Sequence, residues 1–187
     1  MKKQYLVLYV IFALFIGGAN ATAASMNGFV LDDALIPEDE IFFGGPPKYG
    51  IPSLDNLKFV NAGQARLHDE DRVLALKRNR IAKAYPLRIL NWHEIVNDRF
   101  GDEGIIIIYC PLCGSGTASK AKVAGNSLPF GVSGLLYNSD VLMYDRQTQS
   151  LWAQILSQAV SGPMKGTILP AVAVIHTTWA RLASASS

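Results

Sequence analysis

A run of four isoleucines, Ile105 to Ile108, constrains the fold more than any other segment of the sequence. β-Branched side chains favour strands, and the run is too short for an independent helix and shows no polar alternation. A strand that is apolar on both faces has to be covered on both faces. We therefore expect a buried central strand that continues through Tyr109 and ends directly at Cys110.

Other segments also predict strands. Two apolar runs at 73–76 and 81–85 flank the polar turn Lys-Arg-Asn-Arg, which predicts a β-hairpin. A second hairpin is expected around Gly125, with Pro129 near a sheet edge, and a further strand over 141–144. These predictions give a mostly β chain.

One short helix is expected over residues 87–96. Pro86 favours the start of a helix because its missing N–H is not needed in the first turn, and the pair Asn97 and Asp98 is expected to end it. The predicted fold class is therefore mostly β, that is α+β with one or two short helices, with antiparallel sheets or hairpins around a single core.

The first 23 residues have the pattern of a secretory signal peptide. Lys2 and Lys3 precede an apolar run over 5–16, and small residues follow, so cleavage is expected after Ala21 or Ala23. The run is shorter than the about 20 apolar residues that a spanning helix needs. We expect an exported product, periplasmic or secreted, with no stable membrane anchor after processing.

The remaining chain has the size of one domain. Residues 24–54 are rich in proline and glycine and are expected to wrap the domain as an arm, with Ile41, Phe42 and Phe43 held against apolar groups. Residues 55–179 are expected to form the domain and 180–187 a frayed tail.

Charge makes nucleic acid an unsuitable partner. The leader contains two of the 17 basic residues and none of the 15 acidic ones, so the mature chain is formally neutral. A neutral domain lacks the basic surface that usually accompanies nucleic-acid binding. A small molecule or a periplasmic protein is the expected class of partner.

Cys110 and Cys113 are the only two cysteines, and three interpretations of the pair stay open. The pair can close a structural disulfide, cycle as a thioredoxin-like dithiol, or bind a soft metal, with copper and zinc as candidates. Gly-Ser-Gly-Thr after Cys113 favours a loop over the helix on which thioredoxin-like sites depend. A metal would need further ligands, for which the candidates are His93, His176, Asp98 and Asp140.

Residues 130–140 mix glycines with polar groups and admit two interpretations. They either line a pocket or form a bulged strand whose polar side chains bond to the local backbone. Gly-Val-Ser-Gly lacks the spacing of a hydrolase nucleophile elbow, so no catalytic residue is assigned and enzymatic activity stays open. The candidate pocket residues are Glu94, Ser133, Tyr137, Asn138, Asp140 and Trp152.

Several long motifs resemble the prokaryotic exported family called domain of unknown function 3179. The resemblance rests on residues 82–98, on Tyr-Cys-Pro-Leu-Cys-Gly at 109–114, and on residues 130–146 and 150–152. It extends over residues 44–179. Members usually continue beyond this point, so the chain resembles a C-terminally truncated member. The family has no assigned activity, and the resemblance implies export and domain organisation alone.

The leading hypothesis is a periplasmic, thiol-based accessory protein. In it the Cys110/Cys113 loop binds a soft metal, with His93 as a further ligand, or cycles as a dithiol. The alternative is a non-catalytic module that binds a small molecule or protein and contains a structural disulfide.

Overall fold

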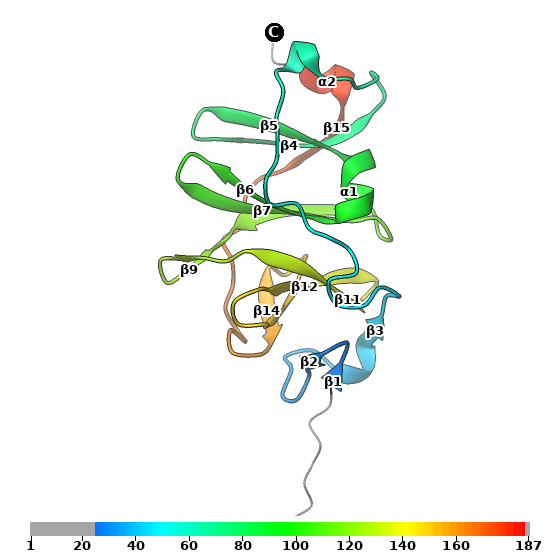
Figure 1. Ribbon diagram of the computed structural model, residues 1–187, viewed down its shortest axis with the longest axis vertical. Coiled ribbons are helices and arrows are strands. Elements are labelled where there is room, and N and C mark those ends of the chain that lie inside the picture. Colours follow the sequence, from blue (N-terminus) through cyan, green and yellow to red (C-terminus); the bar gives the residue numbers. More distant parts are fainter. Residues whose placement is uncertain (1–24, 186–187) are drawn as a thin grey trace, which may run out of the picture.

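The computed structural model describes residues 25–185, so the predicted signal peptide lies outside the described residues. Three antiparallel sheets are stacked along the long axis (Figure 1). Their orders are β15-β4-β5, β6-β7-β8 and β14-β13-β12-β11-β3, and two small hairpins, β1-β2 and β9-β10, complete the β structure. The mostly β fold class is confirmed. None of the described helices is long and apolar enough to cross a membrane.

The strands are β1 (Ser25–Met26), β2 (Phe29–Val30), β3 (Ile41–Phe43), β4 (Arg72–Arg78), β5 (Ile81–Pro86), β6 (Ile95–Phe100), β7 (Glu103–Cys110), β8 (Ser115–Lys120), β9 (Lys122–Val123), β10 (Asn126–Ser127), β11 (Phe130–Tyr137), β12 (Asp140–Asp145), β13 (Leu151–Ala153), β14 (Gln158–Ser161) and β15 (Ile175–Thr178). The helices are α1 (Leu87–His93), α2 (Trp179–Ser184) and two 3₁₀ turns, Glu38–Glu40 and Ala62–Gln64.

The middle sheet is buried on both faces, and β7 is its central strand. On one face of β7, the side chains of Ile105, Ile107 and Tyr109 pack toward β4 and β5. On the other face, the side chains of Ile106, Ile108 and Cys110 pack toward β11 and β12. All four isoleucines have no exposed surface, which confirms the predicted strand with two buried faces.

The predicted hairpin over 73–85 is confirmed as β4 and β5, and α1 follows it as expected. The helix ends at His93, however, and the prediction that it reaches Val96 is wrong. Ile95 and Val96 are fully buried and pair with Ile108 and Ile107 of β7. Burial of these β-branched residues in the middle sheet outweighs the local helical pattern.

The five-stranded sheet contains a β-bulge in β11. The register with β12 shifts between Val132 and Leu135, and Gly134 in the bulge has φ +75°. This agrees with the interpretation of residues 130–140 as a bulged strand. The strand predicted over 141–144 is confirmed as β12, and the hairpin around Gly125 as β9 and β10.

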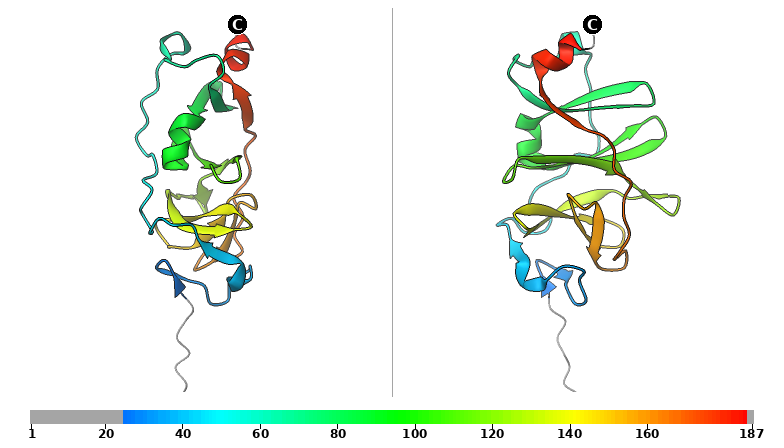
Figure 2. Two further views of the ribbon diagram at one scale, coloured as in Figure 1. Left: turned by 90° about the vertical axis from the view of Figure 1, so that its right-hand side faces the viewer. Right: turned by 180° about the vertical axis from the view of Figure 1, so that it is seen from behind.

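The N-terminal arm covers the outer face of the five-stranded sheet. Phe29, Leu31 and Ile41 are buried there, and β3 adds an edge strand to β11. Phe42 and Phe43 were expected to be held against apolar groups, but they are 59% and 56% exposed. Residues 44–71, which include the end of the arm, then run along one side of the stack from the five-stranded sheet to the sheet of β4 and β5 (Figure 2).

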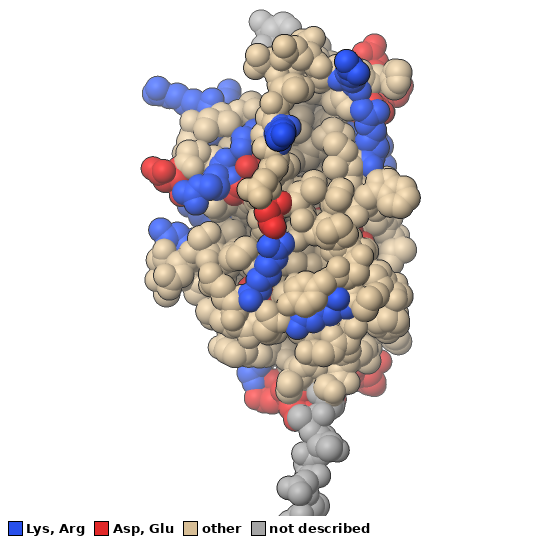
Figure 3. Space-filling model, viewed as in Figure 1, with Lys and Arg blue, Asp and Glu red and all other residues tan. Residues whose placement is uncertain are grey.

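The C-terminal segment returns along the opposite side of the stack (Figure 2). It passes beside β8, where the Val172 N–H donates to the Ala118 carbonyl at 2.8 Å, and continues into β15, which pairs with β4. Residues from 180 were expected to fray, yet α2 extends to Ser184. On the face shown in Figure 3, basic and acidic side chains of the described residues are interspersed.

Candidate functional site

The two cysteines lie on a tight turn between two strands of the middle sheet. β7 ends at Cys110 and β8 begins at Ser115. The Gly114 N–H donates to the Cys110 carbonyl at 2.9 Å, and Gly114 has φ +68°, which glycine adopts without strain. Both cysteines are free thiols; Cys110 is buried and Cys113 is exposed. The turn therefore presents one covered and one accessible sulfur.

A second hairpin brings a carboxylate to these sulfurs. Asn138 and Ser139 turn the chain from β11 to β12 with φ values of +51° and +61°, and Asp140 is the first residue of β12. Its Oδ1 atom lies 3.1 Å from the Cys113 Sγ. Ligand atoms of Cys110, Cys113 and Asp140 all lie within 4.8 Å of one another. We call these three residues the thiol–carboxylate cluster.

Two polar residues that the sequence analysis did not single out, the half-buried Ser115 and the buried Gln154, support this cluster. The Ser115 hydroxyl donates to Asp140 Oδ1 at 2.8 Å and lies 3.0 Å from the Cys113 Sγ. The Gln154 amide donates to the Ser115 hydroxyl at 3.0 Å. Gln154 follows β13 and has no exposed surface, and its Oε1 atom has no partner among the described residues. Nothing in the sequence marks this glutamine, because its position depends on the sheet register.

Burial controls the protonation of the inner sulfur. Desolvation, with the neighbouring Cys113 as a lesser cause, raises the pKa of the Cys110 thiol to about 12. Cys110 is therefore protonated at neutral pH unless a cation displaces its proton. No helix begins after Cys113, so the electrostatic effect that lowers a cysteine pKa in thioredoxin-like sites is missing from this turn.

A groove of about 220 Å³ lies beside the turn. It is bordered by Pro111 and Leu112, which separate the two cysteines, and by Val141, which follows Asp140. Glu94 is the one titratable residue among the described residues that line it. Burial raises the pKa of Glu94 to about 7. Glu94 also has φ +56° and ψ −40°, an unfavourable conformation for a residue with a side chain.

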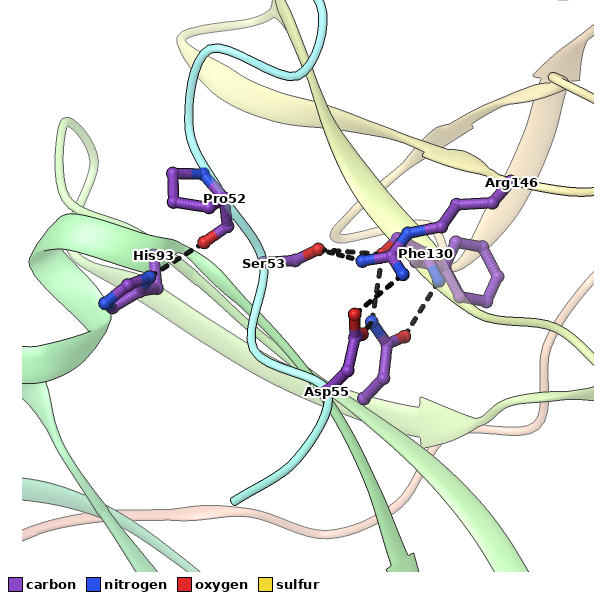
Figure 4. A network of polar contacts seen from close by, with 7 residues as sticks. Pro52, Ser53, Asp55, His93, Phe130 and Arg146 are labelled. Carbon is purple, nitrogen blue, oxygen red and sulfur yellow. Dashed lines mark hydrogen bonds and ion pairs between the residues drawn. The ribbon is translucent and has the colours of Figure 1, made fainter. Parts of the chain in front are cut away.

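The other proposed metal ligands lie elsewhere. His93 is at the end of α1, where its Nδ1 lies 2.8 Å from the Pro52 carbonyl oxygen (Figure 4). Asp98 in β6 accepts bonds from Lys83 and Tyr85. The His176 Nε2 lies 3.4 Å from the Gly116 carbonyl oxygen. Among the described residues, only Asp140 of the four candidates joins the two cysteines.

Most of the predicted pocket residues have contacts within the sheet. The Ser133 hydroxyl donates to the Leu142 carbonyl and accepts from the Leu135 N–H at 3.0 Å. The buried Trp152 donates from Nε1 to Asp145 Oδ2 at 3.0 Å. Tyr137 packs against the hydrophobic residues buried beneath the arm, and Asn138 is exposed in the β11–β12 turn. Glu94 and Asp140 are therefore the two predicted residues next to the groove or the thiols.

Comparison with protein families identifies the chain. The model of the family described as "Protein of unknown function (DUF3179)" matches residues 48–187. The chain belongs to the DUF3179 family. The matched region contains both turns of the thiol–carboxylate cluster, and it also contains Ser115, Gln154 and Glu94. The arm strands β1 to β3 precede the matched region. A search of curated proteins found no match to this DUF3179 chain, and a search of solved structures found none.

Proposed function

We propose that this DUF3179 chain is an exported accessory protein that binds one soft metal ion at Cys110, Cys113 and Asp140. The observation that supports this most is the convergence of three ligand atoms within 4.8 Å from two separate hairpins. A tetrahedral zinc ion with Zn–S bonds of about 2.3 Å holds two sulfur ligands about 3.8 Å apart. The three ligand atoms, all within 4.8 Å of one another, are near enough for side-chain rotation to reach that geometry.

The ligand set favours zinc. Two thiolates suit both Zn(II) and Cu(I), whereas the carboxylate oxygen is a harder ligand that suits zinc better. Three protein ligands leave a fourth position for water or for a ligand from a partner, as in zinc sites that are not closed. Cys113 is exposed, which gives an ion a route to the buried Cys110.

The hydrogen bonds around Asp140 support the same proposal. The Gln154 amide orients the Ser115 hydroxyl, and that hydroxyl orients the carboxylate. Outer hydrogen bonds of this kind fix metal ligands in position and typically account for 10- to 100-fold in affinity, roughly. The carboxylate is next to the Cys113 thiol, whose proton a bound ion would replace.

Spectroscopic titration with cadmium tests the proposal, because cadmium–thiolate bonds absorb in the ultraviolet. We expect the reduced wild-type protein to reach saturation at one ion per chain, and Cys113→Ser and Asp140→Asn to weaken binding. Asp102→Asn is the matched control, since Asp102 lies in the exposed turn between β6 and β7. Equal cadmium binding by Asp140→Asn and the wild type would show that the Asp140 carboxylate is not a ligand.

Dithiol exchange is the second candidate, favoured by the proximity of an exposed and a buried sulfur. The Cys113 thiolate would attack a partner disulfide, and the first partner thiolate would leave and take up a proton. Cys110 would then close the intramolecular disulfide and release the second partner thiol. The chain loses two electrons and two protons, and the partner disulfide gains them. No helix begins after Cys113 to lower a cysteine pKa as in thioredoxin-like sites, which is why we prefer metal binding.

A further inference from the structure

A larger cavity, of about 340 Å³, lies between the arm and the five-stranded sheet, and it shares Ile51 and Val132 with the groove beside the cysteine turn. One wall is formed by four arm residues, Tyr49, Ile51, Pro52 and Ser53, and the other includes Gly131, Tyr144 and Arg146. None of the three cluster residues lines it. Its volume is at the small end of the range for ligand sites, about 300 to 1,000 Å³.

Tyr144 lines this cavity and carries a buried hydroxyl. Its side chain has no exposed surface, and its hydroxyl has no hydrogen-bond partner among the described residues. Gly131 faces it across the β11–β12 pair, and a Cβ atom there would lie 2.5 Å from the hydroxyl. Burial, with the neighbouring Tyr49 hydroxyl as a lesser cause, raises the pKa of Tyr144, so the Tyr144 hydroxyl keeps its proton. No hydrogen bond of ordinary geometry joins the two hydroxyls, and an acceptor on a ligand would satisfy the buried Tyr144 donor.

Two cationic side chains lie near the same space, and Arg146 is the one that lines it. Arg146 follows β12 and is held in position by Ser53 and by Asp55, whose Oδ2 lies 2.8 Å from Nη1 (Figure 4). The Lys48 Nζ lies 5.3 Å from the centre of the Tyr144 ring. Asp55 balances one of these cations, and no carboxylate is among the described lining residues. The site therefore favours an anionic group.

The remaining lining is apolar and aromatic. Tyr49 packs edge-on against Tyr144 with ring centres 5.4 Å apart, and Ile51, Pro52 and Val132 complete the walls. We propose that this cavity binds a small organic carboxylate with an aromatic or branched apolar body. Its carboxylate accepts hydrogen bonds from the Tyr144 hydroxyl and the Arg146 guanidinium, and its body packs against Tyr49 and Ile51. This site is independent of the thiol–carboxylate cluster.

Saturation-transfer NMR and calorimetry with three probes test the proposal. Benzoate has both the anion and the ring, benzamide lacks the charge, and acetate lacks the ring. We expect benzoate to bind one to one at millimolar concentrations or tighter, and the other two to bind at least about 10-fold more weakly, since charged hydrogen bonds and ring burial both contribute. Equal binding of benzamide, or no binding of benzoate, would overturn the proposal.

The variant Tyr144→Phe separates a ligand role from a structural one. It removes only the hydroxyl, so we expect benzoate affinity to fall about 3- to 10-fold while the Tm of the ligand-free protein stays constant or rises. Tyr137→Phe is the matched control, because Tyr137 lies outside the cavity and should leave affinity unchanged. Arg146→Gln should abolish the preference for benzoate over benzamide. Unchanged affinity in Tyr144→Phe would show that the hydroxyl does not contact the ligand.

Discussion

The Sγ atom of Cys113 lies 3.1 Å from Oδ1 of Asp140, although the two residues are 27 positions apart in the sequence. One residue lies on the β7–β8 turn and the other begins β12, so the contact joins the middle sheet to the five-stranded sheet. Soft sulfur ligands and a carboxylate at one point between two sheets form the basis of the proposed metal site.

Ser115→Ala tests whether the outer hydrogen bonds tune this site. The substitution removes the donor to Asp140 at 2.8 Å and leaves both cysteines and the carboxylate in place. We expect zinc affinity to fall by about 10- to 100-fold without loss of folding. Ser127→Ala, at an exposed position in β10, is the control. Competition titration against a chromophoric chelator measures both, and identical affinities would contradict the proposed role of Ser115.

Glu94 predicts a pH dependence of stability. Burial raises its pKa in the folded chain from 4.5 to about 7. Between these values the folded state binds more protons than the unfolded state, so stability falls as pH rises from 5 to 8. We expect Glu94→Gln to reduce this loss by about 1 to 2 kcal/mol.

Urea unfolding at several pH values measures the effect. Glu70→Gln, at an exposed position, is the matched control and should keep the wild-type dependence. A Glu94→Gln variant with the full wild-type slope would show that other groups cause the dependence.

Trp152 is expected to act in folding and not in binding. Its indole donates to Asp145, and neither side chain has exposed surface. Trp152→Phe leaves a buried carboxylate with one donor fewer and a space in the core, so we expect a loss of about 2 to 4 kcal/mol in the free energy of unfolding. Trp92→Phe, where the side chain is 77% exposed, should change it by less than about 0.5 kcal/mol.

Zinc affinity, measured under conditions in which the variant is still folded, decides whether Trp152 acts in folding or in binding. We expect no change in Trp152→Phe. A folded Trp152→Phe variant with impaired zinc binding would place the tryptophan in the functional site after all.

Gly134 is expected to hold the arm against the sheet. It has φ +75°, its carbonyl accepts from the Gly44 N–H at 2.8 Å, and a Cβ atom would lie 2.1 Å from the Pro46 carbonyl oxygen. Gly134→Ala should therefore cost about 2 kcal/mol or more and expose the arm to protease. Gly63→Ala, where a Cβ atom meets nothing within 4 Å, is the control. Equal rates of limited proteolysis in both variants would contradict this role.

Local patterns predicted most of the strands, while contacts between distant segments were harder to predict. The isoleucine run of β7 indicated burial on both faces because no polar residue interrupts it. The helix boundary was misplaced, since Ile95 and Val96 have no local feature that shows their pairing with β7. Tertiary burial decided between two structures that the local sequence allows.

The candidate site was predicted only in part, because it too depends on contacts between distant segments. Cys110 and Cys113 are evident from spacing, and Asp140 was one of four candidate ligands. Its contact with the thiols depends on how two sheets pack, which no sequence period encodes. The same holds for Gln154, whose position follows from the register of β13 with β12. His93 does not join the cysteines, because its ring lies at the end of α1 with Nδ1 against the Pro52 carbonyl oxygen.

X-ray absorption spectroscopy of the reduced protein, loaded with one equivalent of zinc, tests whether Cys110 and Cys113 bind the ion. We expect two sulfur neighbours at about 2.3 Å, and oxygen or nitrogen neighbours at about 2.0 to 2.2 Å. Cys113→Ser should reduce the sulfur count to one. A zinc shell made of oxygen and nitrogen alone in the wild-type protein would contradict a metal site at Cys110, Cys113 and Asp140.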